Sequence, residues 1–68
     1  MIALTFVGID FWGLPNYTTP KGTLVVDLEP QREQPSIYRK TGNDTDGEPD
    51  VPMKQGVEVT FIPERIRS

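Results

Sequence analysis

The sequence of residues 17–28, Tyr-Thr-Thr-Pro-Lys-Gly-Thr-Leu-Val-Val-Asp-Leu, contains two β-prone runs on either side of a tight turn. Aromatic and β-branched residues favour strands at 17–19 and 23–28. Between these runs, Pro20 and Gly22 occupy the second and fourth positions of the tetrapeptide 19–22, where a type I turn favours them. The segment therefore predicts a β-hairpin, and the rest of the chain repeats this pattern of short strands and turns.

Three further segments have the composition of strands. Residues 2–9 are apolar on both faces, residues 36–40 form a short run, and residues 57–62 alternate between apolar and polar side chains. Residues 29–35 are too few for a stable helix. We therefore expect an all-β fold without a substantial helix, a small antiparallel sheet of about five short strands that is curled or barrel-like. The predicted core consists of Leu4, Phe6, Leu24, Val26, Val59 and Phe61.

The length and composition restrict both the architecture and the chemistry. Sixty-eight residues allow a single small β domain, 1–68, with an acidic loop at 41–52 and a tail at 64–68. The chain has no Cys and no His, which excludes disulfides and thiolate-bound zinc and removes the commonest general base. It also lacks a Gly-rich phosphate loop and a base to activate either of its serines, Ser36 and Ser68. We expect a protein without enzymatic activity.

The charge and hydropathy of the chain argue against two classes of partner. The net charge is −3, and the basic residues are scattered, whereas nucleic-acid binders usually carry a basic stripe. No apolar run approaches the roughly 18 residues that a membrane span requires. The N-terminal apolar run has no preceding basic region and no cleavage site, so it is typical of a strand. We expect a cytoplasmic protein that does not associate with membranes or nucleic acid.

The acidic loop contains the one pattern that points to a ligand. The spelling of residues 44–50, Asp-Thr-Asp-Gly-Glu-Pro-Asp, resembles the Asp-x-Asp-Gly-x-x-Asp core of several calcium-loop families. The resemblance implies that Asp44, Asp46 and Asp50 would be ligands, because calcium prefers several oxygen ligands at short range. It departs from the EF-hand, which needs flanking helices and a distal Glu. The alternatives are a solvated loop whose Asp side chains cap its own turns and a contact with a basic partner.

A second resemblance extends over most of the chain. The opening Phe-x-Gly-x-Asp of residues 6–10, then Trp12, and much later Asp-Gly-Glu-Pro-Asp at 46–50 resemble short uncharacterised bacterial proteins with such a C-terminal segment. The resemblance implies no activity. It does imply that Asp10, Trp12 and residues 46–50 form one feature.

Four aromatic residues are candidates for contact with a partner: Phe11, Trp12, Tyr17 and Tyr38. Phe11 and Trp12 are large for a segment that Gly13 marks as a turn. They either fold back over an open end of the core or form an aromatic binding surface.

The residues leave three functions open. We expect first a small protein-interaction or structural domain, whose partner is a second copy in a homo-oligomer or an unknown protein. The first alternative is a calcium-like cation-binding module that uses residues 43–50, and we expect no other cofactor. The second is a small nucleic-acid-binding barrel in which aromatic rings stack on bases and Arg39 and Lys40 contact phosphate. Arg39 and Lys40 otherwise serve to place charge on an edge strand.

Overall fold

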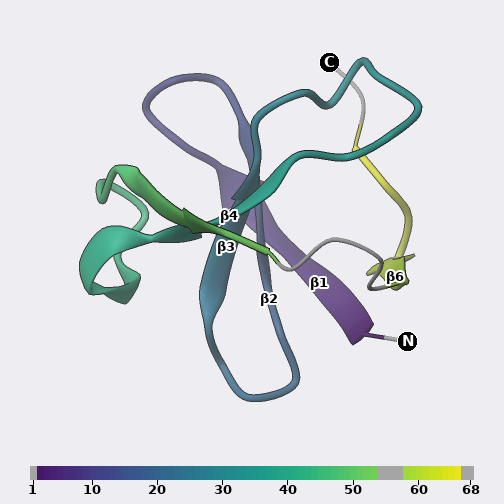
Figure 1. Cartoon of the computed structure of the whole chain (residues 1–68), viewed down its shortest axis with the longest axis horizontal. Helices are drawn as coiled ribbons and strands as arrows, with labels where there is room; N and C mark the ends of the chain where they lie inside the picture. The colour runs from purple at the N-terminus through teal and green to yellow at the C-terminus, as the bar shows by residue number, and fades with distance from the viewer. Residues whose placement is uncertain (1, 54–57, 67–68) are drawn as a thin grey trace.

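The computed structural model describes residues 2–53 and 58–66, and in these residues it contains six strands and one short 3₁₀ turn (Figure 1). The strands are β1 (Ile2–Ile9), β2 (Pro15–Thr18), β3 (Leu24–Asp27), β4 (Ile37–Lys40), β5 (Pro49–Pro52) and β6 (Val59–Ile62). The 3₁₀ turn η1 (Thr41–Asn43) follows β4 directly. The predicted all-β fold without a substantial helix is confirmed. Among the described residues, no helix has the length and apolarity to cross a membrane.

The six strands form a single open sheet in the order β5-β4-β3-β2-β1-β6. Neighbouring strands are antiparallel except for β1 and β6, which are parallel and pair Ile2 with Val59 and Thr5 with Ile62. The predicted antiparallel, barrel-like sheet is therefore corrected to a mixed, open one. β1 and β6 are separated in the sequence by the other four strands, as expected for a parallel pair, which a tight hairpin cannot join.

The sixth strand is one that the sequence interpretation omitted. The prediction treats residues 41–52 as a loop, whereas their second half, Pro49–Pro52, pairs with β4. Proline removes a backbone donor, so it argues against a central strand but is tolerated on an edge strand. β5 is such an edge strand, which explains why two prolines fit within it.

The predicted hairpin is confirmed as β2 and β3, with Thr18 opposite Leu24 and Asn16 opposite Val26. The Gly22 N–H donates to the Thr19 carbonyl at 2.9 Å, and the Thr19 N–H donates to the Thr23 carbonyl at 3.0 Å. Gly22 has φ +84°, which a residue with a side chain rarely adopts. Local turn chemistry therefore fixes this register.

The hydrophobic core lies on one face of the sheet, around Leu4, Tyr17, Val25 and Ile37. Ile2, Phe6, Met53, Val59 and Phe61 pack against this cluster. Of the predicted core residues, Leu4, Phe6, Val59 and Phe61 belong to this group, and Leu24 and Val26 are buried outside it. The residue of β3 in the cluster is Val25, because successive side chains point to opposite faces. All four residues of β3 are buried, so both of its faces are covered.

Candidate functional site

The loop between β1 and β2, residues 10–14, is held closed by its own first residue. The Gly13 N–H donates to the Asp10 carbonyl at 2.9 Å, and the Asp10 N–H donates to the Leu14 carbonyl at 3.0 Å. Asp10 Oδ1 accepts the N–H groups of Trp12 and Leu14, each at 3.0 Å. An Asp side chain that bonds the backbone two residues further on is a common turn device. We call residues 10–14 the aromatic loop.

The other carboxylate oxygen of Asp10 anchors the loop to β4, from which it is distant in sequence. Asp10 Oδ2 accepts from Lys40 Nζ at 2.7 Å and from Asn16 Nδ2 at 3.0 Å. Both charged side chains of the ion pair are fully buried. Burial alone raises the pKa of Asp10, but the hydrogen bonds from Lys40, Asn16 and Leu14 outweigh it and hold the pKa below its ordinary value. The Asp10 carboxylate therefore joins the loop to β2 and to β4.

The two aromatic residues of the loop are open to solvent, and Trp12 lies over the lysine of this ion pair. Lys40 Nζ lies 4.8 Å from the centroid of the Trp12 ring, in a cation–π contact. The Phe11 and Trp12 rings meet edge to face, with centroids 5.5 Å apart. Trp12 remains 47% exposed and Phe11 84% exposed. Trp12 thus covers the buried lysine with one face, while Phe11 projects into solvent.

Two more exposed apolar side chains precede the loop on β1, Val7 at 50% and Ile9 at 53% exposure. Between Thr5 and Leu14 the only charged residue is Asp10, whose side chain is buried. We call Val7, Ile9, Phe11 and Trp12 together the apolar surface. It is a continuous segment of chain without an exposed charge, in a protein of which 25% of the residues are charged.

The other two predicted contact residues do not belong to the apolar surface. Tyr17 is fully buried in the core, away from the surface that a partner would contact. Its ring lies edge to face with those of Phe6 and Phe61, and its hydroxyl accepts the Ile66 N–H at 3.0 Å. Tyr38 is half-buried on β4, opposite Val26.

The predicted calcium ligands are exposed and already have partners in two cases. Asp44 Oδ1 accepts the Asp46 N–H at 3.1 Å, a turn-capping bond, and Asp50 pairs with Arg39 at 3.3 Å. Across residues 2–53 and 58–66, no group of three acidic side chains is placed to hold a metal ion. The neighbouring Asn43 is used structurally, because its amide accepts the Leu24 N–H and donates to the Gly22 carbonyl.

The two basic residues considered for phosphate contact are also paired. Arg39 contacts Asp50, and Lys40 is buried against Asp10. Lys40 contacts both parts of the feature that the second resemblance implies, Asp10 with Trp12 on one side and residues 46–50 on the other. Its side chain contacts Asp10 and Trp12, and its backbone pairs with Pro49 of β5.

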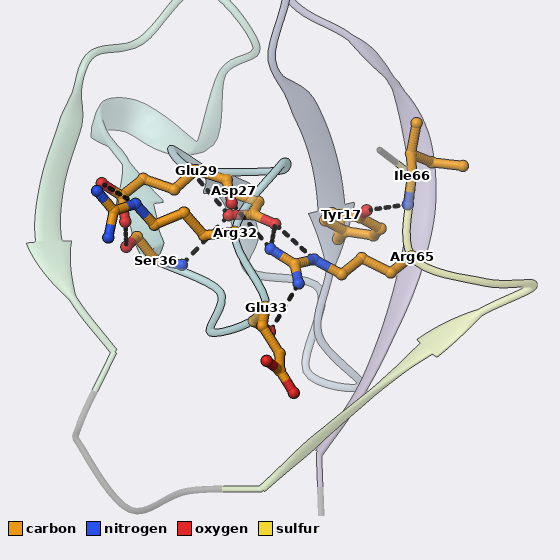
Figure 2. A network of polar contacts seen from close by, with 8 residues as sticks. All are labelled: Tyr17, Asp27, Glu29, Arg32, Glu33, Ser36, Arg65 and Ile66. Carbon is orange, nitrogen blue, oxygen red and sulfur yellow. Dashed lines mark hydrogen bonds and ion pairs between the residues drawn. The ribbon is translucent and has the colours of Figure 1, made fainter. Parts of the chain in front are cut away.

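A second polar network fastens the C-terminal segment across the core face of the sheet. Figure 2 shows the Arg65 side chain directed at Asp27, with Tyr17 bonded to Ile66 beside it. The Arg65 guanidinium donates to Asp27 Oδ2 at 3.1 Å and to the carbonyls of Glu33 and Glu29 at 2.9 and 2.8 Å. The same Asp27 accepts the Glu29 and Ser36 N–H groups through Oδ1. All of these acceptors are satisfied internally, which is typical of a structural anchor.

Sequence reasoning missed both anchoring pairs, Asp10 with Lys40 and Asp27 with Arg65, although it named Asp10 and Lys40 separately. Each pair joins positions far apart in the chain, 30 and 38 residues respectively. A partial signal exists, because Asp27 and Lys40 lie inside runs that predict strands with apolar neighbours. A charged side chain there requires a buried partner.

Comparisons of the chain with protein-family models, with curated proteins and with solved structures found no match.

Proposed function

We propose that this chain is a non-enzymatic protein-interaction domain whose contact surface is the apolar surface. The observation that carries the proposal is the 84% exposure of Phe11 on a loop that the buried Asp10–Lys40 pair holds in place. Burying a phenylalanine side chain is favourable by roughly 1.5–3 kcal/mol. In the free protein Phe11 is not buried, so this free energy is available to a partner that covers it.

The fixed geometry of the aromatic loop supports a binding role for its rings. Association costs conformational entropy when a loop has to be ordered, and a loop that is already ordered avoids this cost. Asp10 orders the loop through the Trp12 and Leu14 N–H groups before any partner arrives. Rigid aromatic side chains on such loops are the residues that dominate many protein interfaces.

The composition of the surface also favours a protein partner over nucleic acid. The centre of a protein interface is enriched in aromatic residues and depleted of charge, and residues 7–12, which carry the apolar surface, contain no exposed charged side chain. A nucleic-acid site needs cations beside its stacking rings. The cation nearest to Trp12 among the described contacts, Lys40, is buried and neutralised by Asp10. The same burial keeps the pair from reaching a substrate, which supports a structural role for it.

Site-specific photo-crosslinking in the cells that produce the protein tests this function. Benzoylphenylalanine replaces Phe11, which is 84% exposed, and in a control it replaces Val51, which is 46% exposed on β5. We expect defined covalent adducts, with a second copy or with another protein, from position 11 and not from position 51. Adducts at neither position, or equal adducts at both, would contradict the assignment of the surface.

A further inference from the structure

The exposed acids before β5 lie close to the aromatic loop. Lys40, whose side chain contacts the Trp12 ring, is the last residue of β4, and its backbone pairs with Pro49. The next residue, Thr41, donates its N–H to the Glu48 carbonyl at 2.9 Å. Because paired strands lie about 4.8 Å apart, Glu48 and Pro49 are one strand spacing from the residue that contacts Trp12. In Figure 1, the loop after β1 and the segment between β4 and β5 extend towards the same side of the molecule.

These acids belong to a short turn that backbone contacts hold in place, and we call residues 44–48 the acidic turn. The Gly47 N–H donates to the Asp44 carbonyl at 2.9 Å, and the Thr41 hydroxyl donates to the Glu48 carbonyl at 3.0 Å. A Cβ atom at Gly47 would collide with the Thr41 carbonyl oxygen, so the turn packs directly against the backbone that follows β4. Like the aromatic loop, the acidic turn therefore needs no ordering by a partner.

The acidic turn carries negative charge that the described part of the chain does not neutralise. Its three acids are exposed and form no ion pair within residues 2–53 and 58–66: Asp44, Asp46 and Glu48. The basic side chains of β4 are already used, because Arg39 pairs with Asp50 and Lys40 pairs with Asp10. The uncompensated charge beside the aromatic loop is therefore negative.

The exposed rings favour a partner of positive charge as well. The face of an aromatic ring is negative and attracts cations. Trp12 already contacts Lys40 in this way, and Asp10 neutralises that lysine, so it does not repel a second cation. The aliphatic stems of Lys and Arg also cover apolar surface while their charged ends remain in water. A basic side chain can therefore cover Phe11, which is 84% exposed, and direct its charge towards the acidic turn.

We propose that the partner of the apolar surface is a basic segment of another protein, whose Lys or Arg stems cover Phe11 and Trp12 and whose charges face the acidic turn. The proposal rests on the proposed function and names the chemistry of its partner. Complementary charge at the rim of an interface speeds encounter and discriminates against wrong partners. A second copy suits this surface less well, because it would bring two acidic turns of a protein with net charge −3 to one interface.

Photo-crosslinking from position 11 in two matched double variants tests the proposal. Benzoylphenylalanine replaces Phe11, and one protein combines Asp46→Lys with Glu48→Lys, while the control combines Glu58→Lys with Glu64→Lys. All four acids are exposed, and both proteins change in net charge from −3 to +1. Glu58 and Glu64 flank β6, at the opposite edge of the sheet from β5. We expect the reversed acidic turn to lower the adduct yield at least about fivefold, and the control to stay within about twofold of the unreversed protein.

Two further readouts separate charge from shape. Asp46→Asn combined with Glu48→Gln removes the charge but keeps the size of both side chains, and it should lower the adduct yield at least about threefold. Mass spectrometry of the adducts identifies the linked segment of the partner, which we expect to be rich in Lys or Arg.

The outcomes distinguish this proposal from the proposed function. Equal adduct yields in the two lysine double variants would overturn the basic partner, as would a linked segment without Lys or Arg, or one from a second copy of this chain. In each of these cases position 11 still forms adducts, so the proposed function stands. If position 11 forms no adducts even in the protein with its acidic turn unchanged, the proposed function fails and the basic partner with it.

Discussion

The side chain of Asp10 has more structural consequences than any other polar group in the aromatic loop. One oxygen closes the loop by accepting the Trp12 and Leu14 N–H groups, and the other accepts from Lys40 and Asn16. A buried ion pair of this kind contributes little net stability compared with apolar residues, yet removing one partner costs several kcal/mol. The main effect of the Asp10–Lys40 ion pair is to fix the positions of Trp12 and Phe11.

The lowered pKa of Asp10 predicts a contribution to acid sensitivity. As the pH falls below about 4, the carboxyl of the unfolded chain takes up a proton before the folded one does, which favours unfolding. The stability from Asp10 is therefore complete above the unfolded-state pKa and is lost as the pH falls through the lower folded value. Asp10→Asn removes this proton uptake, although the variant is less stable at pH 7. The drop in melting temperature between pH 7 and pH 3 should therefore be smaller in Asp10→Asn than in wild type. Equal drops in the two proteins would argue against a lowered pKa of Asp10.

Arg65 is the corresponding residue of the C-terminal segment. Its guanidinium makes hydrogen bonds to Asp27, to the Glu33 carbonyl and to the Glu29 carbonyl. A hydrogen bond that involves a charged group contributes about 1.5–3 kcal/mol to stability. Arg65→Gln should therefore lower the free energy of unfolding by about 2 kcal/mol or more in urea titration. The control, Arg32→Gln, removes only an exposed 3.7 Å pair with Glu29, worth about 0–1 kcal/mol. Equal losses in the two variants would show that Arg65 anchors nothing.

Among the elements, β6 is the edge strand beside the start of β1 and carries an aromatic side chain into the core. The Phe61 ring lies 4.9 Å from that of Tyr17 and 5.8 Å from the Arg65 guanidinium carbon. Its neighbour Ile62 points the other way and is 45% exposed. The alternation along β6 thus separates a core residue from a surface residue at adjacent positions.

This alternation gives a prediction with a built-in control. Phe61→Ala removes a large side chain from the core and should cost about 3 kcal/mol, which is a large share of the stability of so small a domain. Ile62→Ala, one residue further along the same strand, should cost less than about 1.5 kcal/mol, because its side chain is already half in water. Chemical denaturation followed by circular dichroism measures both values. Similar losses in the two variants would mean that the strand faces are wrongly assigned.

The elements also differ in how far the sequence could predict them. The hairpin of β2 and β3 depends on Pro20 and Gly22, which lie within it, so local chemistry is sufficient. β5 was missed because Pro49 and Pro52 are typical of a loop, and only its edge position makes them compatible with a strand. The parallel pairing of β6 with β1 depends on contacts across most of the chain, which no local pattern encodes.

At the scale of the whole molecule, two segments of opposite chemistry meet at Lys40. β5 and the segment before it carry prolines and acidic residues, while residues 7–12 carry apolar side chains and only the buried charge of Asp10. Lys40 contacts Asp10 and Trp12 through its side chain and pairs with Pro49 through its backbone. Phe11 and Trp12 could be predicted as candidate contacts, since both are large residues in a turn. The sequence could not place Tyr17 in the core or Lys40 beneath Trp12, because both positions result from tertiary packing.

The central claim is that the aromatic loop is ordered in the free protein, with Phe11 exposed and ready for contact. Amide hydrogen exchange of the wild-type protein, followed by NMR at Trp12 and Leu14, tests it most directly, because both N–H groups donate to the Asp10 carboxylate. Exchange requires these bonds to open, so its slowing reports the free energy of local opening. We expect both amides to exchange at least about tenfold more slowly than in an unstructured peptide, a local opening free energy of about 1.4 kcal/mol or more. Exchange of both amides at the unstructured rate would contradict an ordered loop and the function proposed for it.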